Sequence, residues 1–557
     1  MSRYTRRICV YAWLGVIILS LWALFIVFSE QPDVSIVVLP HHGITGNNIE
    51  NFYKDLSKKE MHFDTVFVVS PDHFWLTTAN AESLPKGNQK ICYRDICGTA
   101  TSLIGYESKN SKQLYPKHAS IIEHGLGEHI QRIVRYFPQS TIVPLVVKRE
   151  NHVTDLGRKI AKDILYFSKH KKTLVVISVD FSHHVPEPFA QLHDQKSINT
   201  LSWGETRDFD ALEVDCRNCL FIGKEIAKKV WKPYIKIWGR TSVESISGEK
   251  VGTQNTSHVF GTFVSEKIWS PGALFLFAGD THWWRDFDKN EKTKPLLFER
   301  IMRIFYQEND ISKTPSTWYH RILSGFDDVV VNFESTIADT HTCIEDGKKI
   351  QIITKEENIK KLADIGINTV SIANNHTRDC GENIFQKMYD LFPKYGIDVV
   401  GENHDFIKTI YGKKYAFVSI NTIEQKYDID SSINRIHEYS AKKIPVIVNI
   451  HWWHEYEKKH TPEQEAIAHR LIDAGARLII GHHPHVVQEE GYYRGAPIYY
   501  SLGNFVFDET SPETEQWWLV WCDISESHTS CQKVSIYRWR DLTLGWKLNI
   551  RKTGLNQ

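Results

Sequence analysis

The residues with the clearest chemistry in this sequence are acidic, amide and imidazole side chains that follow short apolar runs in the second half of the chain. Each run has the length and composition of a buried strand. Strands of Leu, Ile and Val cannot carry imidazoles into a core, so these side chains must lie just past the strand ends, where open α/β sheets bind ligands. The set is Asp280, His282, Glu334, Asn375, His451, His483 and His485.

This set of side chains favours divalent metal ions. Carboxylate and amide oxygens mixed with imidazoles suit Mn, Fe or Zn and disfavour Ca or Cu(I). The set exceeds one tetrahedral site but suits two ions that share a bridging carboxylate. His483 and His485, with one residue between them, can point to neighbouring positions in a cavity. The alternative is that one or two of the histidines only cap helices or form hydrogen bonds with the backbone.

The elements that must position these residues alternate between strands and helices. A capping box from Thr354 to Glu357 predicts one helix start, and Thr461 with Pro462 predicts another. Alternation of this kind predicts a mostly parallel sheet, and all the polar clusters can converge on one of its edges. The expected strands are 273–278, 328–331, 369–373, 446–450 and 476–480.

Several strings in this half resemble the CapA family of poly-γ-glutamate capsule proteins, which have the calcineurin-like metallophosphoesterase fold. The resemblance covers about residues 274–508 and implies an α/β sandwich. The strings are Gly279-Asp280, Asn332-Phe333-Glu334, Ala373-Asn374-Asn375-His376, His451-Trp452, Gly481-His482-His483-Pro484-His485-Val486-Val487-Gln488 and Tyr500-Ser501-Leu502-Gly503-Asn504-Phe505-Val506-Phe507-Asp508.

The resemblance also implies roles for the site residues. One metal would be held by Asp280, His282 and His485, and the other by Asn375, His451 and His483. Glu334 would lie between the two ions, and His376, together with Asn375, would be catalytic, His376 as the acid beside the leaving group. CapA proteins often have an apolar residue where this chain has His282, so Asp-x-His restores the first motif of true phosphoesterases. Trp453 stands where a Gly is usual and would narrow the cleft.

Histidines also follow three β-branched runs in the first half, at 34–39, 65–69 and 173–178. The runs end at Pro40-His41-His42-Gly43, at Ser70-Pro71-Asp72-His73, and at Val179-Asp180-Phe181-Ser182-His183-His184. Helical patterns lie between them, notably from Thr154 to Ser168. Three strand ends with histidine at one edge of a sheet favour a metal or catalytic cluster over isolated surface histidines.

These strings, with Glu123-His124-Gly125-Leu126-Gly127-Glu128-His129 and Asp215-Cys216-Arg217-Asn218-Cys219, resemble the Memo-like family, also called AmmeMemoRadiSam system protein B. The resemblance covers about residues 35–266. It implies a fold similar to class III extradiol dioxygenases and one metal, Fe or Cu. His41, His73 and Cys216 would be the ligands, with His124, Asp180 and His183 lining the pocket. Two departures are His42, where a small residue is usual, and Arg217, where Gly is usual. Oxidation of Cys216 with Cys219 would remove the thiolate that a metal needs.

The apolar run from Ile8 to Phe28 has about the length of a transmembrane helix. Arginines precede it and acidic residues follow it, so the positive-inside rule predicts a single-pass membrane protein with its body outside the cytoplasm. A cleaved signal peptide is the competing interpretation, but the flanking residues offer a poor cleavage site. In an oxidising compartment, Cys92/Cys97, Cys343/Cys380 and Cys522/Cys531 are possible disulfide pairs by proximity, but the connectivity does not follow from the sequence.

A chain of 557 residues requires more than one domain. The expected organisation is a cytoplasmic stub and anchor at 1–30, a Memo-like domain at 34–266, a linker at 267–272 that contains Pro-Gly, and a CapA-like domain at 273–545. Lys plus Arg and Asp plus Glu both number 67, so the charge balance gives no sign of nucleic-acid binding.

The sequence therefore predicts a membrane-anchored, extracytoplasmic, metal-dependent hydrolase of the phosphoesterase type. Its partner would be an anionic envelope polymer, such as poly-γ-glutamate or capsule, or the phosphorylated precursor of that polymer. Two alternatives stay open. One is a non-catalytic protein that binds the polymer during assembly, and the other is a metal-dependent oxidation in the first domain. The oligomeric state does not follow from the sequence.

Overall fold

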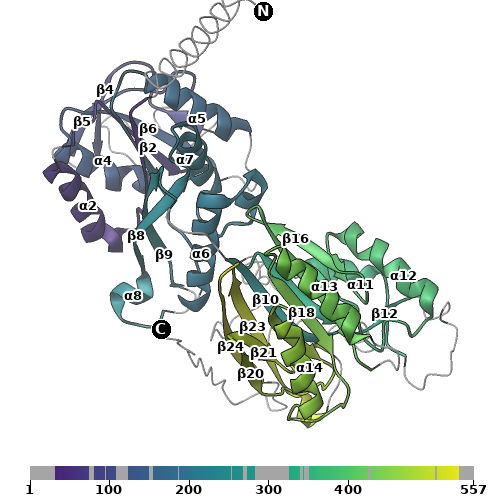
Figure 1. Cartoon of the computed structure of the whole chain (residues 1–557). Helices are drawn as coiled ribbons and strands as arrows, with labels where there is room; N and C mark the ends of the chain where they lie inside the picture. The colour runs from purple at the N-terminus through teal and green to yellow at the C-terminus, as the bar shows by residue number, and fades with distance from the viewer. Residues whose placement is uncertain are drawn as a thin grey trace, which may run out of the picture. The chain divides into compact units, whose positions relative to one another are not determined.

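The computed structural model in Figure 1 describes two compact α/β units, Met1–Ile268 and Trp269–Gln557. We call them the first and the second unit and treat each by itself. The described residues are 32–537 apart from 60, 75–80, 94–95, 108–122, 150–154, 186, 252–253, 268–271, 283–324, 339–342, 344–350, 365, 424–427 and 508–510.

The prediction of a transmembrane helix requires a correction. Within the described ranges, no helix is both long and apolar enough to cross a bilayer. The longest of these helices, α6 (Glu187–Trp203), has 17 residues and includes Gln, His, Asp and Lys, whereas a membrane span needs about 20 mostly apolar residues. The predicted span at 8–28 lies outside the described residues. The fold that the structure supports is α/β in both units, and the predicted single-pass membrane location is not supported.

The first unit is built on one sheet of nine strands, in the order β4-β5-β6-β2-β7-β1-β9-β8, with β3 paired to β6. Its central strands β6, β2, β7 and β1 are parallel. Their carboxyl ends therefore lie at one edge. The strands are β1 (Val34–Leu39), β2 (Thr65–Pro71), β3 (Ala81–Ser83), β4 (Gln89–Tyr93), β5 (Ile96–Ala100), β6 (Thr141–Val147), β7 (Thr173–Ser178), β8 (Tyr234–Ser242) and β9 (Ser257–Val264).

Helices cover both faces of this sheet because both faces of its central strands are apolar (Figure 1). Val37, Val66 and Val176 pack against apolar residues of α2 and α4. On the other face, a Cβ added at Gly223 of α7 would lie 2.9 Å from Ile177 of β7, so α7 sits directly on the sheet. The helices are α2 (Gly46–Lys58), α4 (His124–Tyr136), α5 (Asp155–Phe167), α6, α7 (Arg217–Lys229) and α8 (Val243–Ser247).

The second unit contains two larger sheets. The first of them has the order β15-β14-β11-β10-β23-β24, with β22 paired to β10, and the second has the order β16-β17-β18-β19-β21-β20. The strands are β10 (Ala273–Thr281), β11 (Asp328–Phe333), β14 (Thr369–Ser371), β15 (Asp398–Val400), β16 (Phe406–Ile410), β17 (Lys413–Asn421), β18 (Val446–His451), β19 (Ala476–His482), β20 (Glu490–Tyr493), β21 (Ala496–Tyr499), β22 (Asn504–Val506), β23 (Gln516–Ile524) and β24 (Thr529–Tyr537). A separate pair is formed by β12 (Thr336–Ile337) and β13 (Ile353–Thr354).

The two sheets face each other across one core. Phe275 and Phe277 of β10 pack with Phe417, Ile447 and Leu478 of the other sheet. The outer face of the β18 sheet packs against α13 (Ile429–Ala441) and α14 (Pro462–Asp473), as Figure 1 shows. The remaining described helices are α11 (Glu357–Asp364) and α12 (Glu382–Leu391). The unit is thus a sandwich whose two sheets bring their strand ends close together.

Two helix starts test the capping signals in the sequence. Thr461 is the N-cap of α14, and its side chain accepts a hydrogen bond from the backbone of Gln464, as predicted. The box predicted at Thr354 is wrong, because Thr354 belongs to β13 and α11 begins at Glu357. The strand pairing of Thr354 with Ile337 satisfies its backbone instead.

All eight cysteines in the described part of the chain form disulfides. Three of the pairs, Cys92–Cys97, Cys343–Cys380 and Cys522–Cys531, are those expected from proximity in the sequence. The fourth joins Cys216 to Cys219 at the start of α7. This pair bears directly on the first unit's site.

Candidate functional site

Five strand ends from both sheets of the second unit position the polar cluster. Asp280 lies at the end of β10, Glu334 directly follows β11, and His451 ends β18. Asn375 follows β14, and His483 and His485 follow β19. Strands β10 and β14 run parallel to β11, and β18 runs parallel to β19. The sandwich therefore brings together residues that lie as far apart in the chain as Asp280 and His485, which are separated by 205 positions.

Close backbone approach is needed to bring these strand ends together. A Cβ added at Gly279 would lie 1.7 Å from the carbonyl oxygen of Gly503, and one added at Gly481 would lie 2.0 Å from that of Tyr500. Only glycine fits such contacts. The result is that Asp280 N donates to Gly503 O at 3.0 Å, which fixes the end of β10 against the β22 segment.

Two groups of ligand atoms share the carboxylate of Glu334. One group consists of Asp280, Glu334 and His485, and the other of Glu334, His451 and His483, with the atoms of each group within 4.8 Å of one another. Glu334 Oε1 lies 3.5 Å from His451 Nε2, 3.9 Å from His483 Nδ1 and 3.8 Å from His485 Nε2. A carboxylate between two sets of ligands is the arrangement expected of a bridging ligand.

The predicted ligand Asn375 lies beside the second group. His451 Nε2 is 2.8 Å from Asn375 Oδ1, so the imidazole and the amide oxygen face the same point. His485 Nδ1 is 2.8 Å from Asn504 Oδ1, and that contact leaves His485 Nε2 facing Glu334. Partners of this kind orient histidine ligands in metal sites.

The structure does not bring His282 into either group. Among the described residues, His282 belongs to no set of three or more ligand atoms within 4.8 Å. Its ring meets Phe507 edge-on, with 4.1 Å between the ring centroids. Phe507 in turn contacts the ring of His485. The role of His282 as a ligand stays a prediction.

Sequence reasoning missed three residues around this cluster. His482 Nδ1 lies 3.5 Å from Asp280 Oδ1, and Asn332 Nδ2 donates to Asp280 Oδ1 at 2.8 Å. Glu455 is exposed and forms a group with His483 and His485. The Asn332-Phe333-Glu334 string contained a signal for Asn332, since residues two apart on a strand point to the same side.

His376 lies beside the cluster with a carboxylate partner. Its Nδ1 is 2.8 Å from Asp379 Oδ2, and the backbone N–H of His376 donates to Asn374 Oδ1 at 3.1 Å. The His376 side chain is 14% exposed, whereas Asp379 is buried. A histidine oriented by a carboxylate and reachable from solvent suits proton transfer.

The local backbone at the end of β19 is strained. His483 has φ 91° and His485 has φ 58°, in the left-handed region that non-glycine residues seldom occupy. Such strain costs of the order of 1–3 kcal/mol per residue and clusters at functional sites. The conformation turns both imidazoles toward Glu334 and is supported by a hydrogen bond from His483 N to Asp280 Oδ2.

Burial and neighbouring charges shift the pKa values of the side chains in this cluster. Burial raises the pKa of Glu334 well above its usual value, and the neighbouring Asp280 carboxylate adds to the rise. For Asp280, burial acts in the same direction, but hydrogen bonds with His482 and His485 outweigh it and hold its pKa well below the usual value. Burial, together with the other histidines, lowers the pKa of His483 to about 3. His483 is therefore neutral and able to bind metal near pH 7.

The donor chemistry of this cluster fits a pair of divalent cations. Two carboxylates, an amide oxygen and three imidazoles converge in a buried place, and Glu334 Oε1 has no hydrogen-bond partner there. A buried carboxylate oxygen without a partner is costly unless a cation compensates for it. The residues that would hold the ions are Asp280, Glu334, Asn375, His451, His483 and His485.

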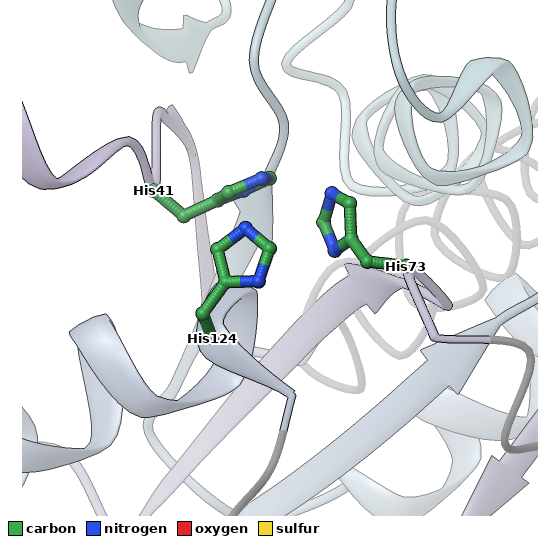
Figure 2. Close-up of side chains that lie close together, drawn as sticks. All are labelled: His41, His73 and His124. Atoms are coloured by element: carbon green, nitrogen blue, oxygen red, sulfur yellow. The ribbon is translucent and has the colours of Figure 1, made fainter.

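The first unit gathers three histidines at the carboxyl edge of its sheet. Figure 2 shows His41, His73 and His124 with their rings turned toward one another. His41 follows β1, His73 follows β2, and His124 begins α4. Ligand atoms of the three lie within 4.8 Å of one another. Glu123 caps α4 by accepting from Gly125 N, which places His124 at the edge of the cluster.

Carboxylates complete this cluster. Asp180, a predicted pocket residue, accepts a hydrogen bond from the backbone of His41 at 3.0 Å and lies 3.4 Å from His41 Nε2. Asp215, which sequence reasoning did not single out, lies 3.1 Å from His41 Nε2 and 3.5 Å from His73 Nε2. His183 Nδ1 contacts Phe181 O at 2.6 Å, and the charges of Asp180 and Asp215 act on His183.

Cys216 requires a correction. The resemblance implied that it is a thiolate ligand, but in the structure its sulfur is bonded to Cys219. A disulfide sulfur carries no thiolate and so cannot act as the expected ligand. The family's implied set of His41, His73 and Cys216 therefore does not fit this chain as it stands.

Ionisation in the first unit differs from that in the second. For His73, burial would lower the pKa, but contacts with Asp215 and Glu123 outweigh burial and raise it to about 9. For His124, burial and the charge of His41 lower the pKa to about 4. The buried carboxylates thus favour the protonated form of His73.

Comparisons with known proteins agree with the two-part organisation. The profile of the family described as bacterial capsule synthesis protein PGA_cap matches residues 275–509, and that of the family described as Memo-like protein matches residues 23–220. These matches confirm the two resemblances seen in the sequence.

Individual relatives match the second half. A capsule biosynthesis protein CapA of Bacillus anthracis is 31% identical over 272 residues, which are 43% of this chain and 66% of that protein. A PGA biosynthesis protein CapA of Bacillus subtilis (strain 168) is 31% identical over 229 residues, 37% of this chain and 60% of that protein. A probable polyglutamine synthesis accessory protein of Mycobacterium tuberculosis is 42% identical over 62 residues, 11% of this chain and 16% of that protein. The match therefore spans less than two thirds of each relative. This chain joins a Memo-like domain to a domain of the bacterial capsule synthesis protein PGA_cap family.

Proposed function

We propose that this protein acts in the synthesis of a capsule or poly-glutamate polymer, and that its second unit is a metal-dependent hydrolase of the phosphoester type. The names of the relatives support the biological role. The observation that carries the chemistry is the pair of ligand groups that share Glu334. Two acidic side chains and several neutral imidazoles, buried together, make a site for two divalent cations among Mn, Fe and Zn.

Bound divalent ions at this site would lower the pKa of a water molecule and bind the negative charge that develops on a phosphoryl oxygen. The residues of the chain supply the rest. His376 donates a proton to the leaving oxygen, and Asp379 holds the ring of His376 by accepting from Nδ1. Asn375 directly precedes His376 in the chain, and its side-chain oxygen contacts His451, so it links the proton donor to the metal ligands.

Polymer access is compatible with this proposal. Trp452, which follows His451, is fully buried and packs with Ile450 and Tyr500 in the core against α13 and α14. Its indole therefore does not occupy the metal cluster. An anionic polymer or phosphorylated precursor would be attracted to the two cations. The predicted partner, an anionic envelope polymer, is thus part of the proposal.

A combined metal and turnover measurement tests the proposal. The full-length protein is loaded with Mn, Fe or Zn, its second-unit metal content is measured, and a phosphodiester, a phosphomonoester and poly-γ-glutamate are offered as substrates. We expect two equivalents in the second unit and turnover of a phosphoester. Asp280→Asn should lose metal and turnover together. His469→Gln, on the surface of α14, is the matched histidine control and should retain both.

The outcome also separates the alternatives. Two bound metals with binding of poly-γ-glutamate but no hydrolysis would show a polymer-binding protein. Absence of metal from the second unit of the wild-type protein would overturn the site assignment itself. Turnover that persists in Asp280→Asn would place the chemistry elsewhere in the chain.

A further inference from the structure

We infer that the first unit binds one divalent transition-metal ion through His41, His73 and the carboxylate of Asp215, in place of the Cys216 thiolate that the family resemblance implies. This inference concerns the first unit alone and does not rest on the function proposed for the second unit. Iron(II) is the ion that this set of side chains suits best, because two imidazoles and one carboxylate with an open side are typical of non-haem iron sites.

The tautomer of His41 is fixed by its outer partner. His41 Nδ1 lies 3.0 Å from Ser178 Oγ, and the single hydroxyl proton of Ser178 goes to Gly125 O at 2.8 Å. Ser178 can therefore only accept from His41, so Nδ1 carries the proton. Nε2 is left to face the centre of the cluster as a metal ligand.

The ring of His73 is oriented in the same way. His73 Nδ1 donates to Glu123 Oε1 at 2.6 Å, and the backbone N–H of His73 donates to Glu123 Oε2 at 3.0 Å. Glu123 is buried and is itself held by Gly125 N. A histidine whose far nitrogen is bound to a carboxylate is the usual outer arrangement of a metal site.

Both Nε2 atoms face one oxygen of Asp215. Asp215 Oδ2 lies 3.1 Å from His41 Nε2 and 3.5 Å from His73 Nε2. Ligands that each lie about 2.1 Å from one ion are about 3.0–3.4 Å apart, so the His41 separation lies in this range and the His73 separation lies just above it.

One oxygen of Asp215 has no hydrogen-bond partner in the described part of the chain. Its side chain is fully buried, and its Oδ1 has no hydrogen-bond partner. Oδ2 accepts from the backbone of Asp180 at 3.2 Å, which holds the carboxylate in place. A buried carboxylate oxygen without a partner is destabilising, and a bound cation would compensate for it.

The disulfide also excludes the Cys216 thiolate as a metal ligand. Cys216 and Cys219 are both buried and bonded to each other at the start of α7. Asp215 directly precedes Cys216 in the chain. It is therefore the sequence neighbour of the residue that the family resemblance implies as a ligand. The open side of the cluster is at His124, whose side chain is 42% exposed. A small ligand can therefore reach the ion from that side.

Cobalt(II) is the probe that distinguishes the two ligand sets, because thiolate ligands give it an intense near-ultraviolet charge-transfer absorption. The full-length oxidised protein is titrated in a Glu334→Gln, His485→Ala background, which removes second-unit ligands. We expect one equivalent to bind without that absorption. Asp215→Asn should weaken binding at least about 100-fold, since even outer-shell changes cost 10–100-fold. The double variant Cys216→Ser/Cys219→Ser should retain the wild-type affinity within about threefold.

Three outcomes would overturn the inference. These are a thiolate absorption in the oxidised protein, loss of cobalt in the double cysteine variant, and unchanged binding in Asp215→Asn. If Asp215→Asn does not fold, the cobalt spectrum of the protein that retains Asp215 provides the test. A thiolate ligand gives the near-ultraviolet absorption and a carboxylate ligand does not. A bound ion without thiolate absorption supports the inference, and no bound ion contradicts it.

Discussion

Single side chains in the second unit have separable roles because their partners differ. Asp280 and Glu334 contact imidazoles and are buried, which is the environment of metal ligands. His376 contacts a carboxylate instead, and its ring is partly exposed. A ligand and a proton donor therefore respond differently to substitution.

His376→Ala should lower kcat by about 10²–10⁴-fold and leave the metal content of the second unit unchanged, because a positioned acid contributes that much to a proton-transfer step. Asp379→Asn should lower kcat less and alter the limb of the pH–rate profile that reports the acid, since Asp379 orients the ring and does not itself donate the proton. Steady-state kinetics and metal analysis of each variant provide the test. Loss of metal in His376→Ala would mean that His376 is a ligand.

Helix α7 joins two features of the first unit. Its start carries Cys216 as N-cap, with the disulfide to Cys219. Its middle carries Lys224, which is buried and donates from Nζ to Ser202 O at 2.6 Å and to Pro233 O at 2.8 Å. Burial, with a smaller contribution from Lys228, lowers the pKa of Lys224 to about 7. The helix therefore makes the stability of the first unit depend on pH.

Lys224 should make the first unit more stable as the pH rises from about 7 toward 10. In that window the unfolded lysine, with a pKa of about 10.4, holds a proton that the folded lysine has lost. The free energy of unfolding then increases with pH by up to about 1.4 kcal/mol per pH unit. Urea unfolding of the first unit at several pH values measures the slope. Lys224→Met should remove this contribution, and Lys229→Met on the same helix should retain it; equal slopes in both variants would contradict the prediction.

At the scale of the whole molecule, each unit has its own core and its own cluster of ligands. The core of the first unit lies between its sheet and α2 and α4, and that of the second lies between its two sheets. No described ligand group mixes residues of the two units. Each unit should therefore bind metal through its own residues.

Chelation should lower the melting temperature of the second unit by roughly 10 °C. An ion at about 1,000 times its Kd stabilises the folded unit by about 4 kcal/mol. In a domain of this size, each kcal/mol of stability shifts Tm by about 2–4 °C. Calorimetry with and without chelator should resolve this transition. In Glu334→Gln the same chelator should have little effect on it, since Glu334 belongs to both ligand groups. A shift of equal size in that variant would show that the ions stabilise the unit from other places.

Much of the second unit's cluster could be predicted from the sequence. Apolar runs that end in Asp280, Glu334, His451 and His483 indicate strand ends, because burial and β-branching are local properties of a run. The parallel arrangement then predicts convergence at one edge, and the structure brings these residues together. Local signals were also misleading, as at Thr354, where a capping pattern lies in a strand.

Only the tertiary structure decided which neighbours complete each cluster. His482, Asn332 and Glu455 join the second unit's cluster, and His282 does not, because the path of the chain after each strand sets the direction of each side chain. In the first unit, Asp215 faces His41 and His73 while Cys216 is bonded to Cys219. The sequence determined the residue types at the strand ends. Adjacent residues such as Asp215 and Cys216 can exchange roles, because only packing in three dimensions decides which of two neighbouring side chains faces the site.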